Sequence, residues 1–288
     1  MYDIAIVGTG PAGLSAAINA VARNKSVVVF GRGRETSALW KAERVANHLG
    51  ANGQTGAEIL AAYHQHAQEL NIEIHTGRVL QIMPMGSSFT LNAEGELVEA
   101  KAVILASGMQ TGKKLPGEEA FLGRGVSYCA TCDGMLYRGK DVFIIGEIEE
   151  ADEDANFLAE ICPSVTYLPL YTKTPDAHPP HLHEKITILA GKPEEILGEA
   201  TVTGLRVKGK VHPCGGVFMI KAAAPLDSLV FGLQTENNAV AVNRLMETNI
   251  PGLYACGDCT GWPLQLSKAI GEGLIAAQAA ARFIDAKK

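Results

Sequence analysis

Two cysteines separated by two residues are followed directly by an acid, in the run Cys129-Ala130-Thr131-Cys132-Asp133. A thiolate attacks a disulfide, and a second sulfur at this spacing can quickly resolve the mixed disulfide that forms. An adjacent carboxylic acid can carry the proton. The residue types therefore predict dithiol–disulfide exchange, with Cys129, Cys132 and Asp133 as the catalytic group.

A second pair with the same spacing, Cys256 and Cys259, leaves alternatives open. The two pairs together could hold a structural zinc ion, which takes four ligands. Cys256 and Cys259 could also form a second redox pair, or they could simply be small buried side chains. We predict that the chain has no metal site.

A glycine-rich turn near the N-terminus predicts a dinucleotide cofactor. The turn Gly8-Thr9-Gly10-Pro11-Ala12-Gly13 follows a short apolar run and opens a helical pattern. The first glycine permits the tight turn, the second lets the backbone approach a pyrophosphate, and the third lets the helix pack closely on the strand. A tight turn without a ligand is the simpler alternative. The acid that usually contacts the ribose is missing, because the second strand ends at Phe30-Gly31.

The elements that must position these residues are two strand–turn–helix–strand units, which predict parallel sheets. The first unit has strands at 4–7 and 26–30 around a helix at 14–23. The second has strands at 141–145 and 165–168 around a helix at 151–161. We therefore expect an α/β fold of two nucleotide-binding (Rossmann-like) three-layer domains, one inserted in the other. The expected segments are 1–112 with 222–288, and 113–221 as the insertion.

Composition excludes several classes of function. The formal net charge of −6 argues against non-specific nucleic-acid binding. No apolar run reaches the roughly 20 residues of a membrane-spanning helix. The N-terminal residues read as a strand rather than a signal peptide, so we expect a cytoplasmic location. In that reducing compartment the six cysteines would not be structural disulfides.

The run Cys129–Gly134, the first glycine turn and the pair Gly257-Asp258 together resemble the low-molecular-weight thioredoxin reductases. The resemblance implies FAD as the cofactor, thioredoxin as the substrate and a homodimer. It implies that Cys132 faces the flavin and that Cys129 exchanges with the thioredoxin disulfide. The residues that it assigns to FAD are Gly8, Gly10, Pro11, Ala12, Gly13, Gly31, Asn47, Gly257, Asp258 and Gln265. The arginine that commonly precedes this glutamine is Leu264 here.

The second domain departs from the family where NADPH should bind. Its turn runs from Gly146 to Ala151, but Ile148 stands where the middle glycine should be. Six acids crowd the turn and the start of the helix: Glu147, Glu149, Glu150, Asp152, Glu153 and Asp154. Each carboxylate near a phosphate costs about 1–4 kcal/mol. The basic cluster expected after the next strand is replaced by Pro169-Leu170-Tyr171. These departures resemble the ferredoxin-dependent flavin thioredoxin reductases, and they imply reduced ferredoxin as the electron donor.

Several other functions remain possible. A diflavin-linked reductase would hold a second flavin in the inserted domain, and an NAD(P)H-dependent reductase would still bind its coenzyme there. An FAD-dependent transferase would not need the Cys129–Cys132 pair. A silent FAD-binding module is the non-enzyme alternative.

Overall fold

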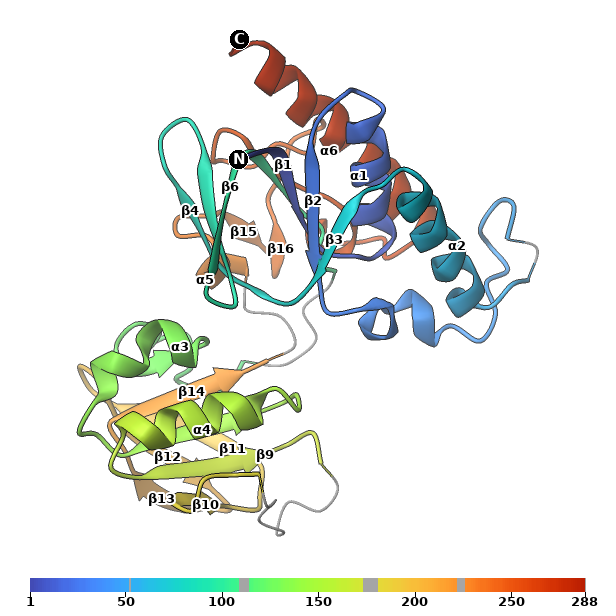
Figure 1. The fold of residues 1–288 in the computed structure, drawn as a ribbon. Helices are drawn as coiled ribbons and strands as arrows, with labels where there is room; N and C mark the ends of the chain where they lie inside the picture. The colour runs from blue at the N-terminus through green and yellow to red at the C-terminus, as the bar shows by residue number, and fades with distance from the viewer. Residues whose placement is uncertain (52, 109–113, 173–180, 222–225, 288) are drawn as a thin grey trace. The chain divides into compact units, whose positions relative to one another are not determined.

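The two predicted strand–turn–helix units lie in two separate parts of the chain (Figure 1). The structure is a computed structural model, and it describes residues 1–51, 53–108, 114–172, 181–221 and 226–287. Unit 1 comprises Met1–Thr111 and Pro225–Lys288, and unit 2 comprises Gly112–Ala224. The predicted limits at 112/113 and 221/222 touch segments outside the described residues. The type of ligand assigned to each domain stays a prediction.

Unit 1 is built on a mainly parallel sheet in the order β3-β2-β1-β6-β5-β4, with β17 pairing to β6. Its parallel strands are β1 (Tyr2–Val7), β2 (Val27–Gly31), β3 (Glu73–Thr76), β6 (Glu96–Leu105) and β17 (Leu253–Ala255). Its antiparallel strands are β4 (Val79–Pro84) and β5 (Phe89–Ala93). The central strands are continuous apolar runs because both of their faces are covered. Helices pack on one face, and apolar side chains of β4, β5 and residues 226–240 pack on the other.

Unit 1 also has three long helices, α1 (Pro11–Val21), α2 (Gly56–Glu69) and α6 (Leu266–Asp285), and the short helix α5 (Leu226–Leu229). A small antiparallel pair, β15 (Thr235–Glu236) with β16 (Ala239–Val240), belongs to the same unit. Helices α1 and α6 approach closely because small residues lie between them. A Cβ on Gly273 would come within 2.3 Å of the Ala12 carbonyl oxygen. The Ser15 hydroxyl donates to the Ile270 carbonyl over 2.7 Å. This packing fixes the start of α1, where the glycine turn lies.

Unit 2 has a second parallel sheet, in the order β10-β9-β8-β14-β7. Its strands are β7 (Val126–Ser127), β8 (Val142–Gly146), β9 (Val165–Pro169), β10 (Ile186–Ile188) and β14 (Gly216–Ile220). Val142 and Ile144 pack on helix α4 (Ala151–Ile161), whereas Phe143 and Ile145 pack on a small antiparallel sheet. The strands of that sheet are β11 (Pro193–Gly198), β12 (Val202–Val207) and β13 (Lys210–Pro213).

The alternation along β8 gives unit 2 three layers: helix, parallel sheet and antiparallel sheet. The predicted α/β architecture with two Rossmann-like domains is confirmed. Because β7, β8, β9 and β14 are parallel, their carboxyl ends lie along one edge of the sheet. Ligands of open α/β sheets bind at such an edge.

Candidate active site

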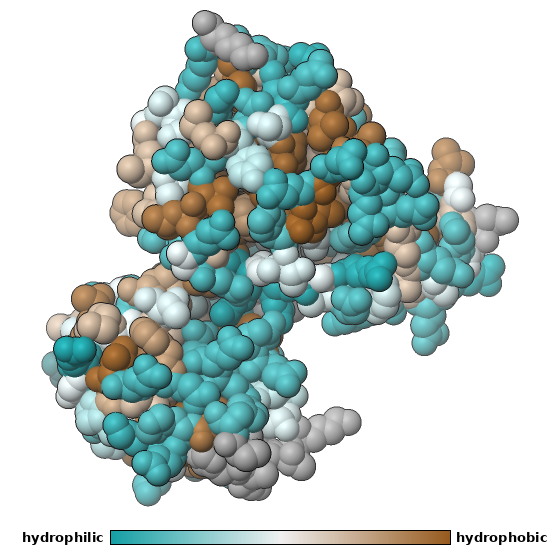
Figure 2. Space-filling view, viewed as in Figure 1, coloured by the Kyte–Doolittle hydropathy of each residue, from teal (hydrophilic) through white to brown (hydrophobic). Residues whose placement is uncertain are grey.

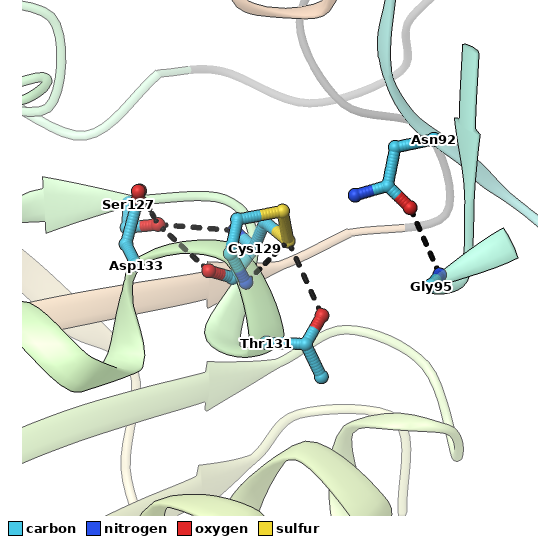
Figure 3. The surroundings of a disulfide bond; sticks show 7 residues. Asn92, Gly95, Ser127, Cys129, Thr131 and Asp133 are labelled. Carbon is cyan, nitrogen blue, oxygen red and sulfur yellow. Dashed lines mark hydrogen bonds between the residues drawn. A yellow bond between two sulfur atoms is a disulfide. The ribbon is translucent and has the colours of Figure 1, made fainter. Parts of the chain in front are cut away.

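Cys129 and Cys132 form a disulfide in unit 2, directly after the edge strand β7 (Figure 3). Cys129 is the N-cap residue of the short helix α3 (Ala130–Asp133), and the Cys132 backbone N–H donates to its Sγ over 3.1 Å. The Thr131 hydroxyl lies 3.5 Å from the same sulfur. Hydrogen-bond donors around a sulfur favour its thiolate. The structure therefore surrounds Cys129 with groups that can stabilise the charge left on it when the disulfide opens.

Ser127 links this cysteine to the acid that follows the pair. Its Oγ lies 2.7 Å from Oδ2 of Asp133 and accepts the Cys129 backbone N–H over 3.1 Å (Figure 3). Ser127 is buried, whereas Asp133 is half-buried. Our sequence analysis missed Ser127, because a serine two residues before a cysteine forms no motif. The structure thus adds a hydroxyl that holds the predicted acid in place.

The surface beside the disulfide is apolar and open to solvent. Cys129 is buried but Cys132 is exposed. The next residues form the 3-10 helix η3 (Gly134–Tyr137), in which Met135 is 54% exposed and Leu136 is 72% exposed. Exposed apolar side chains next to a reactive group are typical of a surface that binds another protein.

A buried ion pair lies next to the cysteine segment. Glu118 is fully buried, and its Oε1 accepts Nζ of Lys221 over 2.6 Å and the Tyr128 hydroxyl over 2.7 Å. Its Oε2 accepts the Leu115 backbone N–H over 2.7 Å. Tyr128 directly precedes Cys129, and Lys221 directly follows β14. One carboxylate therefore ties together the cysteine segment and both ends of the inserted unit.

In unit 1 the first glycine turn has the geometry that the sequence predicts. A Cβ on Gly8, whose φ is +129°, would lie 2.1 Å from the Ala106 carbonyl oxygen. A Cβ on Gly13 would lie 1.9 Å from the carbonyl oxygen of Gly8. For Gly10 the nearest atom would be 3.8 Å away. Two glycines therefore serve packing, whereas Gly10 leaves its backbone open at the N-terminus of α1.

A cavity of about 720 Å³ adjoins this turn at the ends of β2 and β3, and its lining includes Thr9, Gly31, Arg34 and His64. A Cβ on Gly31 would lie 2.5 Å from the Thr9 hydroxyl, so no acid fits there. Nε2 of His64 is buried, and none of the described residues gives it a hydrogen bond. Burial lowers the pKa of His64, which favours the neutral ring. An unpaired buried nitrogen in a cavity indicates a ligand position.

Residues far apart in the sequence meet at the N-terminus of α6. The Asn47 amide donates to the Gln265 side-chain oxygen over 2.8 Å. His48 lies 3.2 Å from the Ser267 hydroxyl and 3.1 Å from the Tyr63 hydroxyl. The structure thus brings together the two residues, Asn47 and Gln265, that the resemblance assigns to the flavin.

Gly257 and Asp258 begin the 3-10 helix η4 (Gly257–Thr260), which is held against the glycine turn. A Cβ on Gly257, whose φ is +80°, would lie 2.7 Å from the Ala12 Cβ. Glu272 accepts the Gly257 backbone N–H over 2.9 Å, and Lys268 donates to the Gly257 carbonyl over 2.9 Å. Burial raises the pKa of Asp258. Lys268 and Glu272 are functional candidates that our sequence analysis missed; both project from α6 toward this turn.

Cys256 and Cys259 are both buried and do not form a disulfide. The Cys259 sulfur donates to the carbonyls of Leu105 and Cys256. Burial raises the pKa of Cys259 to about 12 and that of Cys256 well above its usual value. Burial thus disfavours the reactive thiolate at both positions, which favours the interpretation of the two cysteines as small buried side chains. No group of metal-binding side chains was found among the described residues.

The second glycine turn is filled by side chains. Ile148 is buried in the core beneath α4. Glu150 is the N-cap residue of α4, yet its side chain gives no cap hydrogen bond. Burial raises the pKa of Glu147. An apolar side chain and several acids thus stand where a pyrophosphate would need open backbone.

Among the described residues, the hydropathy of the visible surface does not point to a further binding site. The face shown in Figure 2 is largely hydrophilic, with apolar side chains scattered between polar ones. None of the helices within the described ranges is long and apolar enough to cross a membrane.

Three comparisons bear on this site. The model of the pyridine nucleotide-disulphide oxidoreductase family matches residues 2–169 and 181–273. A thioredoxin reductase from Aquifex aeolicus is 30% identical over 100% of this chain and 95% of its own. The crystal structure of a ferredoxin-flavin thioredoxin reductase from Clostridium acetobutylicum has a TM-score of 0.90 and 46% identity, covering 98% of this chain and 97% of its own. A thioredoxin reductase structure from Gloeobacter violaceus has a TM-score of 0.76 and 29% identity, covering 100% of this chain and 95% of its own. These matches confirm the resemblance predicted from the sequence.

Proposed function

The chain belongs to the pyridine nucleotide-disulphide oxidoreductase family as a thioredoxin reductase-like flavoprotein, and we propose that it uses FAD and reduced ferredoxin to reduce thioredoxin. One contrast carries the proposal. Unit 1 keeps an open glycine turn beside a cavity, whereas Ile148 fills the corresponding turn of unit 2. The proposal also includes a cytoplasmic location and a homodimer, both of which the family resemblance implies.

The residues of unit 1 fit FAD. The open backbone at Gly10 and the N-terminus of α1 suit a pyrophosphate, and the cavity with the unpaired His64 nitrogen suits the nucleoside. Asp258, Asn47 and Gln265 would then hold the flavin end. When bound, FAD supplies the two electrons that open the Cys129–Cys132 disulfide.

The chemistry of the reduced pair follows from the hydrogen bonds around it. The Cys129 thiolate attacks one sulfur of the thioredoxin disulfide, forming a mixed disulfide and releasing the other thioredoxin sulfur as a thiolate. Asp133, held by Ser127, is placed to move the proton that this thiolate needs. Cys132 then attacks the Cys129 sulfur, which releases reduced thioredoxin and restores the Cys129–Cys132 disulfide. Two electrons pass to thioredoxin in each cycle.

Exposure supports a protein substrate. Cys132, Met135 and Leu136 all lie on the surface of unit 2, so a partner can cover the apolar pair next to the Cys129–Cys132 disulfide. A small-molecule disulfide would gain little from these two side chains. We therefore assign Met135 and Leu136 to thioredoxin binding.

Ferredoxin is favoured as the donor by two observations. The 46%-identical Clostridium acetobutylicum protein is named a ferredoxin-flavin thioredoxin reductase. The coenzyme turn of unit 2 is filled and surrounded by acids. A plant-type ferredoxin at about −400 mV lies below thioredoxin at about −270 mV, which makes transfer of two electrons favourable by about 6 kcal/mol. Each ferredoxin supplies one electron, so two are consumed for each disulfide.

Anaerobic reduction of the flavin with each candidate donor tests the proposal. We expect reduced ferredoxin to bleach the flavin absorbance within seconds, while NADPH and NADH leave it oxidised. Rapid bleaching by NADPH would remove ferredoxin from the proposal. Two flavins per chain, measured on the purified protein, would favour the diflavin alternative.

The cysteine roles are tested separately. Cys132→Ser should trap a mixed disulfide between Cys129 and thioredoxin, because the resolving sulfur is missing. Cys129→Ser should form no mixed disulfide through position 129 and should abolish thioredoxin reduction. Cys214→Ser, which alters a buried free cysteine, is the matched control and should keep full activity. Turnover by Cys129→Ser would exclude this pair as the catalytic dithiol.

A further inference from the structure

Asp152 lies in the first turn of α4 and is 5% exposed, although it is an acid. Its Oδ1 accepts the Tyr167 hydroxyl over 2.6 Å and the Tyr171 hydroxyl over 2.7 Å. Its Oδ2 lies 2.7 Å from Nε2 of His181. A buried carboxylate needs such donors, since burial without them is very costly. The three donors define a small oxyanion site that this carboxylate fills.

The donors are held firmly. Tyr167 lies in the middle of β9 with its side chain fully buried. Burial raises the pKa of Tyr171 to about 12 and also raises that of Tyr167, so both phenols stay protonated donors at neutral pH.

A second side chain of α4 holds the segment that carries His181. Asn156, four residues after Asp152, donates to the His181 carbonyl over 3.0 Å and accepts the His183 N–H over 2.8 Å. Residues 181–183 are therefore fastened to the same face of α4 as the carboxylate.

The Asp152 site lies where a dinucleotide-binding fold would hold its coenzyme. In dinucleotide-binding folds the pyrophosphate lies at the helix that follows the first strand, and the ribose lies at the end of the next strand. Here those places are the start of α4 and the end of β9, and the Asp152 network joins them. A Cβ on Gly146, the last residue of β8, would lie 2.7 Å from the Tyr167 hydroxyl oxygen. The network therefore lies directly beside the filled turn.

We propose that Asp152 is a built-in anion, held by Tyr167, Tyr171 and His181 in the position of a coenzyme phosphate, and that it excludes pyridine nucleotides from unit 2. An incoming phosphate would meet the charge of this carboxylate and would find the nearby donors already engaged. The inference goes beyond the proposed function, because it assigns the exclusion to one residue and requires neither ferredoxin nor thioredoxin. It also predicts that removing the carboxylate uncovers a site for a small anion.

Chemical rescue of the holoprotein tests the inference. Asp152→Ala should unfold at a lower temperature than wild type, and acetate or inorganic phosphate should raise its midpoint by several degrees more than chloride of equal ionic strength. Wild type should not respond. Glu153→Ala, which removes an exposed acid from the same turn, is the matched control and should show no rescue. Equal responses of Asp152→Ala and wild type would overturn the proposal.

Binding of adenosine 2′,5′-bisphosphate gives a second readout. We expect Asp152→Ala to bind this probe at least tenfold more tightly than wild type. Asp152→Asn keeps the shape of the side chain without its charge, so it remains testable if the alanine variant does not fold. It should bind the probe more tightly than wild type, and affinity equal to wild type would reject Asp152 as the excluding group. Neither readout depends on electron transfer, so the proposed function can fail without affecting either result.

Discussion

The Asn47 amide donates to the side-chain oxygen of Gln265 over 2.8 Å, joining residues 218 positions apart in the sequence. One lies in the loop before α2 and the other is the N-cap residue of α6. The bond fixes two side chains that the family resemblance places at the flavin.

Removing this hydrogen bond should weaken cofactor binding. We expect Asn47→Ala and Gln265→Ala each to cost about 0.5–1.5 kcal/mol of FAD affinity, the usual range for one neutral hydrogen bond. The double variant should lose less than the sum of the two. FAD titration of the apoprotein measures this, with the exposed Gln81→Ala as a control. Fully additive losses would show that the bond makes no contribution.

The glycines of the first turn should respond differently to alanine. Gly13→Ala would force a Cβ to 1.9 Å from the Gly8 carbonyl oxygen, so we expect loss of the folded protein. Gly10→Ala meets nothing closer than 3.8 Å, so it should fold but retain much less FAD. Circular dichroism and the flavin content of the purified variants separate the two outcomes. A Gly10→Ala protein with full FAD content would argue against a pyrophosphate at this turn.

Ser127→Ala should slow thioredoxin reduction without loss of flavin. The change removes the hydroxyl that lies 2.7 Å from Asp133 and leaves the Cys129 backbone N–H without its acceptor. We expect a several-fold lower turnover rate and an unchanged flavin spectrum, measured with thioredoxin as substrate. Ser87→Ala, at an exposed turn of unit 1, serves as the control. A normal rate would mean that Asp133 needs no support from Ser127.

Breaking the Glu118–Lys221 pair should destabilise unit 2. Removing one partner of a buried pair leaves an uncompensated charge and typically costs about 3–5 kcal/mol. We expect Lys221→Met to lower the free energy of unfolding by such an amount, as measured by urea denaturation. The double variant Glu118→Leu with Lys221→Met should recover much of the loss, because no lone charge then remains. A double variant as unstable as the single one would contradict this account.

Much of the architecture could be predicted from the sequence, because it rests on strong local patterns. Helix α4 spans the predicted residues 151–161, and β9 (Val165–Pro169) extends the predicted strand 165–168 by one residue. The start of helix α6 at Leu266 has no such pattern, because the side chain of its N-cap residue Gln265 makes no capping hydrogen bond. Strand β7 has only two residues, too few to show any periodicity.

Cys129 and Cys132 could be recognised in the sequence because their spacing is itself a motif. The residues that hold them were not visible, since Ser127, Glu118 and Lys221 act through contacts that only the fold creates. The same is true of Asp152, which appeared in the sequence as one acid among six. Its donors His181 and Tyr171 lie 29 and 19 residues away, so no local pattern pairs them with it.

The four cysteines outside the working pair are all buried, and burial raises the pKa of each. We therefore expect these four thiols to react only slowly with water-soluble thiol reagents while the protein stays native. A colorimetric thiol titration of the intact protein would then report mainly on the exposed Cys132, and so on whether its disulfide with Cys129 is open. The burial of the other cysteines thus allows the oxidation state of this disulfide to be measured on the native protein, without unfolding, digestion or mass spectrometry.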